Sequence, residues 1–232
     1  MKKQRVLTII PARGGSKRVP GKNKKKLAGK ELIRYAIEAS LHSKETDTIV
    51  VSSDDEDILS IGREYPSVIC LRRPEEISGD KALAITYVHH ALEQLSESFD
   101  LVVIVQPTSP FTLGSDIDST IRLLDNKRAD SSVSVMQLDH AIHPLKLKIK
   151  KDNELFPYLE EEKGRMAAHE LSELYARNGS VYVSRITNIH EGKIIGDVCL
   201  GYEMPRERSL DINDKLDFEF AEYLINKSKS KD

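Results

Sequence analysis

Short apolar runs alternate with segments whose apolar positions repeat at helical spacing through the first half of the chain. Runs such as TIVVS and LVVIV are typical of strands buried on both faces of a sheet, and LIRYAIEASLH places its apolar residues on one helical face. This alternation predicts an α/β domain with a mainly parallel sheet, whose ligands bind at the carboxyl ends of the strands. The predicted strands cover 6–11, 48–52, 67–71, 101–105 and 132–136, and the predicted helices cover 31–43, 55–65, 81–96 and 114–126.

The alternation ends after about Leu138. Residues 138–173 are highly charged, and the stretch KIKKDNELF within them resembles a hairpin with Asp-Asn at its turn. Order returns with a strand over 180–184 and a last helix over 215–227. We therefore expect one domain over 1–232, with an excursion at about 138–173 that serves as a lid, as an oligomer arm or as both.

The composition is that of an ordinary folded protein, with 39% hydrophobic and 31% charged residues among 232. A formal net charge of -2 gives no global positive field for nucleic acid, so any basic patch is local. The apolar run after the basic N-terminus is short and is interpreted as the first strand instead of a signal peptide, and no run approaches membrane-spanning length. We expect a cytoplasmic protein with no nucleic-acid or membrane partner. Cys70 and Cys199, both in apolar runs, are expected to be buried free thiols.

Polar residues follow the second predicted strand directly. Asp54 and Asp55 stand where the next predicted helix begins, and both are expected to cap it.

Residues 9–26, IIPARGGSKRVPGKNKKK, lead from the first predicted strand into two glycines and a cluster of lysines and arginines. The stretch is not a Walker A loop, because Ser16 stands at the first glycine position and Asn23 replaces the magnesium-binding hydroxyl. The dinucleotide fingerprint is absent as well. Gly14 and Gly15 nevertheless allow backbone N–H groups to form a concave anion nest. The sequence therefore predicts a loop that binds a polyphosphate, with its charge offset by Arg13, Lys17 and Lys22.

Residues 12–23, ARGGSKRVPGKN, closely resemble the signature A-R-G-G-S-K-G-x-P-x-K-N of the acylneuraminate cytidylyltransferases, which are also called CMP-sialic acid synthetases. The resemblance continues in order and spacing along nearly the whole chain, through VVSSDDEDI, LRRPEEISGDKA, QPTSPF, YARNGSVYV and RSLDINDKLDFEFAE. The Kdo cytidylyltransferases look less similar, because their opening loop lacks the GGSK run.

This resemblance implies a Rossmann-like, three-layer nucleotidyltransferase fold that transfers CMP from CTP to a nonulosonic acid, with release of pyrophosphate. The candidate acids are N-acetylneuraminate, legionaminate and pseudaminate. The resemblance also implies Mg²⁺ or Mn²⁺ as the cofactor, and a homodimer in which the 138–173 excursion is exchanged between subunits and caps the sugar site. Two alternatives stay open: a nucleotidyltransferase for another sugar, such as Kdo or a sugar phosphate, and a non-catalytic nucleotide-binding homologue.

The matching motif positions imply a nucleotide site built from two blocks. The loop after the first strand would bind the triphosphate, and its Lys22 would stabilise the transition state and the leaving pyrophosphate. Asn23 would contact the cytosine or its ribose, while Arg73 and Ala82 would read the cytosine edge. The alternative for Arg73 is a surface salt bridge. The implied nucleotide-binding residues are Arg13, Gly14, Gly15, Ser16, Lys17, Lys22, Asn23, Arg73 and Ala82.

The resemblance also implies a sugar site further along the chain. Gln106 follows the most apolar strand, and its amide offers both a donor and an acceptor where sugar and nucleotide should meet. Arg177 can pair with the sugar carboxylate, and His143 is a possible base for which a structural role is preferred. Relatives often carry an R-Q-D-L-P-like run where this chain has Ala168 and His169, so the accepted sugar stays open. The implied sugar-binding residues are Gln106, Ser109, Arg177, Asn178 and Tyr182.

The family's metal motif is D-I-D, in which two carboxylates of an extended segment face one cation. Here Asp211 matches the first aspartate and Asn213 replaces the second, so we expect a metal site at these two residues with weakened magnesium binding. Asp214 is a candidate for compensation, and Asp217 is expected to support the last helix. The implied catalytic residues are Lys22, Arg13 and Asp211.

Overall fold

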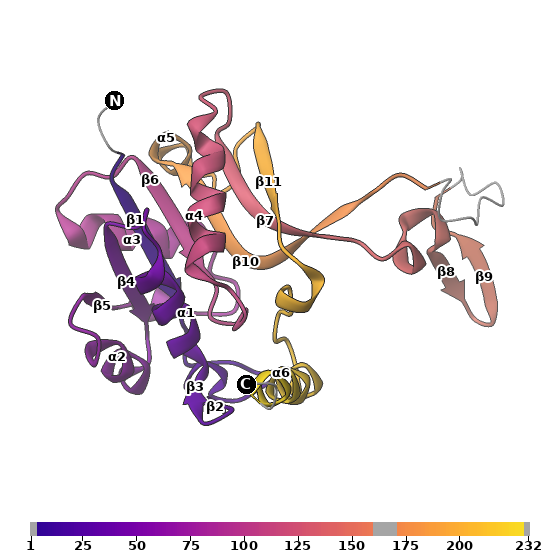
Figure 1. Ribbon diagram of the computed structural model, residues 1–232, viewed down its shortest axis with the longest axis horizontal. Helices are drawn as coiled ribbons and strands as arrows, with labels where there is room; N and C mark the ends of the chain where they lie inside the picture. Colours follow the sequence, from indigo (N-terminus) through magenta and orange to yellow (C-terminus); the bar gives the residue numbers. More distant parts are fainter. Residues whose placement is uncertain (1–3, 160–170, 230–232) are drawn as a thin grey trace.

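The computed structural model describes residues 4–159 and 171–229 of the chain. Its centre is a seven-stranded sheet in the order β5-β4-β1-β6-β10-β7-β11 (Figure 1). Neighbouring strands are parallel except that β10 runs antiparallel to both β6 and β7, which confirms the predicted mainly parallel sheet. The strands are β1 (Val6–Pro11), β4 (Thr48–Ser53), β5 (Val68–Arg72), β6 (Leu101–Val105), β7 (Ser131–Gln137), β10 (Tyr175–Arg185) and β11 (Cys199–Glu203).

Helices cover both faces of the sheet and form the predicted three layers (Figure 1). Successive strand residues point to opposite faces, so Val6 and Ile10 of β1 enter one core while Leu7 and Ile9 enter the other. The first core packs against α1, α2 and α4, and the second packs against α3 and α5. Within the described residues, no helix combines the length and apolar character needed to cross a membrane. The helices are α1 (Leu32–His42), α2 (Glu56–Arg63), α3 (Ala84–Leu95), α4 (Gly114–Arg122) and α5 (Ile186–His190).

A third, smaller core ties the loop after β1 to the C-terminal part of the chain. The loop contains a 3₁₀ turn (Lys22–Lys24) and the paired strands β2 (Lys26–Leu27) and β3 (Lys30–Glu31). Helix α6 (Lys215–Lys229) lies beside β2 and β3 (Figure 1). The long loop is therefore held in place by the last helix, through a core of Val19, Leu27, Leu32, Ile212, Phe218 and Ala221.

Strands β7 and β10 lead away from the sheet into an arm that projects from the body (Figure 1). The arm carries a hairpin of β8 (Lys148–Lys151) and β9 (Glu154–Pro157), which confirms the hairpin prediction. Asp152 takes the left-handed conformation in its turn, at φ 52°. The departure at Ala168 and His169 lies outside the described residues. The hairpin exposes the apolar side chains of Ile149, Leu155, Phe156 and Tyr158.

Several local predictions need correction. Helix α5 and strand β11 were not predicted, and the first half of β10 was missed because its Arg-Asn-Gly sequence lacks a strand pattern. Cys199 is exposed, so the expectation of a buried thiol is wrong there, because β11 is an edge strand with alternate residues facing solvent. Cys70, on the opposite edge strand, is half-buried, and both thiols are free.

Candidate active site

Segments far apart in the sequence meet at the carboxyl edge of the parallel strands. Because β10 is antiparallel to β6, its beginning lies at the same edge as the end of β6. Backbone hydrogen bonds join the segments, with donor and acceptor pairs Ala12–Ser52 (3.0 Å), Arg73–Ser53 (2.7 Å), Gln106–Ser180 (3.0 Å) and Ile212–Thr108 (2.8 Å).

A cleft of about 250 Å³ lies at this edge. It brings together Arg13, Arg73 and Ala82 from the predicted nucleotide set with Gln106 from the predicted sugar set. The N–H of Ala82 donates to the carbonyl of Gly79 over 3.1 Å, so its own carbonyl is the backbone group left to face a ligand. The remaining lining residues are Pro11, Gly79, Asp80 and Tyr87.

Arg73 is buried beside this cleft, with only 5% of its surface exposed. Its Nη2 donates to the carbonyl of Ser52 over 2.9 Å, and its Nε donates to the hydroxyl of the same residue over 3.2 Å. The guanidinium carbon lies 4.7 Å from the ring centroid of Tyr87. Burial lowers the pKa of Arg73, and no hydrogen-bonded carboxylate partner occurs among the described residues. The alternative of a surface salt bridge is therefore wrong for Arg73.

Asp80 forms ion pairs with both Arg13 and Lys17. Hydrogen bonds from Lys17 and Arg13 lower the pKa of the Asp80 carboxyl, which keeps it charged. Arg13 and Lys17 are two of the cations predicted to bind a triphosphate. A protein carboxylate therefore lies where the sequence predicts the phosphates of a ligand.

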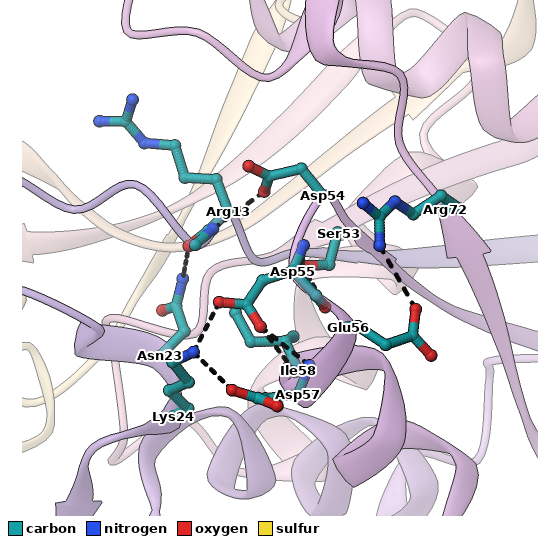
Figure 2. A network of polar contacts seen from close by, with 11 residues as sticks. Arg13, Asn23, Lys24, Ser53, Asp54, Asp55, Glu56, Asp57, Ile58 and Arg72 are labelled. Carbon is teal, nitrogen blue, oxygen red and sulfur yellow. Dashed lines mark hydrogen bonds and ion pairs between the residues drawn. The ribbon is translucent and has the colours of Figure 1, made fainter.

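The loop with the predicted anion nest lies beside the acidic segment after β4, as Arg13 and Asn23 of the loop and Asp54 and Asp55 show (Figure 2). The N–H of Gly14 donates to Asp54 Oδ1 over 2.9 Å, so Asp54 braces the loop and is not the predicted helix cap. Asp55 does cap α2, as predicted. A Cβ at Gly14 would lie 2.7 Å from Asp55 Oδ2, an oxygen that Lys24 Nζ holds at 2.8 Å. Gly14 is therefore required by close packing against an anchored carboxylate.

Asn23 lies on the inner side of the same loop. Its Nδ2 donates to the carbonyl of Arg13 over 3.0 Å, while the Arg13 side chain points away from the acidic segment (Figure 2). The buried Oδ1 of Asn23 has no hydrogen-bond partner among the described residues. An unpaired buried acceptor is costly, which favours a ligand donor at this position.

Lys22 points towards the C-terminal segment. Its Nζ donates to the carbonyl of Ile212 over 2.7 Å. Burial lowers the pKa of Lys22, and the nearby charge of Asp211 opposes this shift. The structure therefore brings the predicted catalytic residues Lys22 and Asp211 together.

The predicted metal site keeps one carboxylate. Asn213 Nδ2 donates to Asp211 Oδ2 over 3.0 Å, so the amide covers the Asp211 carboxylate. Among the described residues no group of three histidine, cysteine or acidic side chains suits a metal ion. One carboxylate and one amide oxygen nevertheless fit Mg²⁺, which keeps several waters and binds one or two carboxylates plus substrate phosphates.

The two other aspartates of this segment serve α6. The N–H of Asp217 donates to Asp214 Oδ1 over 3.0 Å, and the N–H of Asp214 donates to Asp217 Oδ2 over 3.2 Å. This reciprocal pair is a capping box at the start of the helix. Asp214 therefore has a structural use, and Asp217 supports the last helix as expected.

A second cleft, of about 400 Å³, lies beside the start of β10. It brings together Arg177, Asn178 and Tyr182 with Asp211. The pairing of β10 with β7 shifts register between Arg177 and Tyr182, and Gly179 lies in this irregular stretch with φ 77°. A Cβ at Gly179 would lie 3.5 Å from Asp211 Oδ2. The remaining lining residues are Met136, Gly179 and Ser209.

Asn178 is buried, and its side chain connects the segments that form this cleft. Its Oδ1 accepts from Ser134 Oγ over 2.6 Å, and its Nδ2 donates to Ser209 Oγ over 3.0 Å and to Met204 Sδ over 3.2 Å. The Asn178 side chain thus joins β7, β10 and the segment that leads to Asp211. Its use for a sugar contact stays a prediction.

Ser109 and His143 are both buried. Ser109 Oγ has no partner among the described residues, and neither cleft is lined by it. His143 Nδ1 accepts from the N–H of Leu145 over 3.2 Å and caps a 3₁₀ turn, in keeping with the preferred structural role.

Sequence reasoning missed Asp54, Asp80 and Tyr87. Asp54 and Asp80 lie inside quoted motif blocks, which was a usable signal, but their contacts with the loop after β1 span 40 and 67 residues of sequence. Tyr87 gave no such signal, because it occupies an ordinary core position of a helical pattern.

The parallel sheet, the cationic loop at its carboxyl edge and the two adjacent clefts define an α/β protein of the nucleotidyltransferase kind. A family model described as "Cytidylyltransferase" matches residues 7–195. The chain belongs to this family, which confirms the family resemblance found in its motifs.

Two curated relatives are about equally similar. One is the N-acylneuraminate cytidylyltransferase of Escherichia coli O18:K1:H7, 31% identical over 94% of this chain and 51% of that protein. The other is the CMP-N,N'-diacetyllegionaminic acid synthase of Legionella pneumophila, 30% identical over 95% of this chain and 96% of that protein. The chain thus spans about half the length of the first relative and nearly all of the second.

A solved structure has the same fold. It is a CMP:2-keto-3-deoxy-manno-octonic acid synthetase in complex with CTP, and it superimposes with a TM-score of 0.72. The match covers 97% of this chain and 99% of that chain at 14% sequence identity. At this identity the likeness shows the fold alone, and it confirms the predicted fold class.

Proposed function

We propose that this chain activates a nonulosonic acid by transferring CMP to it from CTP. The anomeric oxygen of the sugar acid forms a bond to the α-phosphorus, the bond from that phosphorus to the β-phosphate oxygen breaks, and pyrophosphate leaves while the hydroxyl proton passes to solvent. The observation that carries the proposal is the pair of clefts on either side of the β6–β10 contact. One contains Arg13 and Arg73, and the other contains Arg177 and Asp211.

Such a reaction needs positioning and charge neutralisation more than covalent help from the protein. Arg13, Ser16 and Lys17 would bind the triphosphate, which takes over the ion pairs that Asp80 now makes. Lys22 would face the leaving pyrophosphate. An ammonium group has three N–H donors, and only one of those on Lys22 is used by the Ile212 carbonyl.

The base would lie in the smaller cleft. Arg73 offers N–H donors to the oxygen and ring nitrogen of cytosine, and the Ala82 carbonyl can accept from its amino group. Asn23 Oδ1 would accept from the nucleotide. Arg177 would pair with the sugar carboxylate in the larger cleft, with Gln106, Ser109, Asn178 and Tyr182 as its predicted neighbours.

Mg²⁺ or Mn²⁺ is the proposed cofactor, held by Asp211 and by the amide oxygen of Asn213 after that amide turns over. When bound, the ion would neutralise charge on the CTP phosphates. Restoring the second carboxylate should tighten this site. Asn213→Asp should lower the half-saturating Mg²⁺ concentration several-fold, because it adds a second charged ligand to the site. Asp214→Asn, which alters only the α6 cap, is the matched control.

A homodimer that works in the cytoplasm completes the proposal. The exposed apolar side chains Ile149, Leu155 and Phe156 of the arm hairpin suit contact with a second copy of the chain. Light scattering should give twice the chain mass, and a monomer at assay concentrations would contradict the dimer.

The decisive assay measures pyrophosphate formed from CTP, UTP, ATP or GTP with each of N-acetylneuraminate, legionaminate, pseudaminate and Kdo. We expect turnover with CTP and one of the first three acids. Turnover with Kdo alone would establish the alternative sugar. The non-catalytic alternative is favoured by Asn213, and it would be established if neither the natural chain nor Asn213→Asp turns over any acid.

A further inference from the structure

Arg73 and Tyr87 form an isolated pair at the nucleotide cleft. The Arg73 side chain has five N–H donors, and the two hydrogen bonds that it makes among the described residues both go to Ser52. These bonds hold one side of the guanidinium against β4. The opposite edge of the group, with Nη1, makes no hydrogen bond among the described residues, so its orientation depends on a second surface.

Tyr87 supplies that surface. Its ring is buried, with 7% of its surface exposed, and packs in the core with Leu7, Ile9 and Val50. The guanidinium carbon of Arg73 lies 4.7 Å from the ring centroid, within the range of a cation–π contact. A ring that is fixed by the core therefore fixes the plane of the guanidinium above it.

Tyr87 also lines the cleft, together with Arg73 and Ala82. Its hydroxyl has no hydrogen-bond partner among the described residues. The ring face is therefore the part of Tyr87 with an observed contact.

We propose that Tyr87 is a positioning residue for base selection, because its ring holds the Arg73 guanidinium in the orientation that distinguishes cytosine from uracil. This inference rests on the proposed binding of a cytidine nucleotide in this cleft. Cytosine presents an acceptor at its ring N3, whereas uracil carries a hydrogen there. A fixed N–H donor therefore favours cytosine and opposes uracil, while a donor that can turn finds a carbonyl oxygen on either base.

The test compares two substitutions of Tyr87. Tyr87→Phe keeps the ring face and should keep the ratio of CTP to UTP affinity within about twofold, since the cation–π contact remains. Tyr87→Leu removes the ring face and should lower that ratio about tenfold, which corresponds to about 1.4 kcal/mol and lies between the values for exposed and desolvated cation–π contacts. Affinities are measured by calorimetry, and the affinity for inorganic triphosphate should be the same in both variants.

A matched control exists on the other face of the sheet, where Tyr65 packs against the first core, whereas Tyr87 belongs to the second. The guanidinium of Arg34 lies 5.7 Å from the ring centroid of Tyr65, outside both clefts. Tyr65→Leu should lower the melting temperature without changing the ratio of CTP to UTP affinity. If Tyr87→Leu does not fold, Tyr87→Met takes its place, because methionine fills similar space without a ring face.

Two results would overturn the inference. One is an unchanged ratio in Tyr87→Leu or Tyr87→Met, and the other is an equal loss in Tyr87→Phe, which would assign the effect to the hydroxyl. A failure of the proposed function would be seen in the natural chain itself. That chain would then bind CTP no more tightly than inorganic triphosphate and no more tightly than UTP.

Discussion

The two clefts at the carboxyl edge of the sheet are built from different interactions. Around the nucleotide cleft, Asp80 forms ion pairs with Arg13 and Lys17, and Asp55 pairs with Lys24 in the adjoining loop, while the buried Arg73 has no such partner among the described residues. The larger cleft takes its shape from neutral hydrogen bonds of Asn178 and from the irregular start of β10. The first cleft should therefore respond to charge and salt, and the second to changes in backbone shape.

The largest effect should come from Lys22, which donates to the Ile212 carbonyl close to Asp211 of the larger cleft. Lys22→Ala should lower kcat about 10²- to 10³-fold, the usual cost of losing one group that stabilises transition-state charge. Pyrophosphate release measures it. Lys26→Ala, an exposed lysine of the same loop, is the control and should stay near the natural rate. A loss below about tenfold at Lys22 would contradict the assigned role.

Gly14 tests the packing of the phosphate loop. Gly14→Ala places a Cβ 2.7 Å from Asp55 Oδ2 and should cost about 1–3 kcal/mol of the free energy of unfolding, as overpacking does. CTP affinity should fall as well. Gly15→Ala meets no atom within 4 Å and serves as the control for stability, measured by chemical denaturation. Equal stability of the two variants would show that the loop moves freely.

Asn178 tests the neutral half of the comparison. Asn178→Ala removes the buried hydrogen bonds of this side chain with Ser134 and Ser209 and should cost about 1–3 kcal/mol of stability. KM for the sugar acid should rise while the affinity for CTP stays the same. Asn188→Ala removes a hydrogen bond to the carbonyl of Asp130, which precedes β7 at the edge of the sheet opposite the clefts. This variant should lose stability without a change in KM. A matching loss of CTP affinity would mean that the clefts are not separate.

Asp80 should give a smaller effect of opposite sign. Asp80→Asn removes a carboxylate that competes with phosphate for Arg13 and Lys17, so inorganic triphosphate should bind about two- to fivefold tighter, as expected for exposed ion pairs. The gain should shrink at high salt. Glu97→Gln, which alters an ion pair with Arg5 elsewhere, should leave the affinity unchanged. Weaker binding by Asp80→Asn would assign Asp80 a direct part in the ligand site.

The smallest effect is a shift in pH dependence. Burial lowers the pKa of Lys22 below the ordinary lysine value of 10.5, so this cation loses its proton at a lower pH than a surface lysine does. The rate should therefore fall on the alkaline side before pH 10.5. Lys22→Arg keeps its charge over this range and should move the decline to higher pH. An unchanged alkaline limb would show that Lys22 does not set it.

Sequence reasoning worked where local pattern and function coincide. The parallel strands, the hairpin of the arm and the loop after β1 were all predicted, because apolar periodicity and glycine-rich motifs are local signals. It also assigned Lys22 and Asp211 to one catalytic site, although only the family motifs related these distant positions.

It failed where tertiary contacts decide the outcome. The burial of Arg73 depends on contacts with Ser52 and Tyr87, and nothing in the sequence links either residue to Arg73. Cys199 is exposed because its strand ends the sheet, and strand order is not written in a strand's own residues. Asp54 was predicted to be a helix cap because its position before α2 is a local signal. Its hydrogen bond from Gly14 joins two loops that are distant in sequence and leaves no such signal.

The most direct test of the account is ³¹P NMR of the protein with CTP, Mg²⁺ and the panel of sugar acids. The account predicts that the three CTP signals are replaced by one phosphodiester signal from a CMP-linked sugar and by pyrophosphate, with one nonulosonic acid only. Formation of CDP and orthophosphate, or CTP that stays intact with every acid, would contradict it.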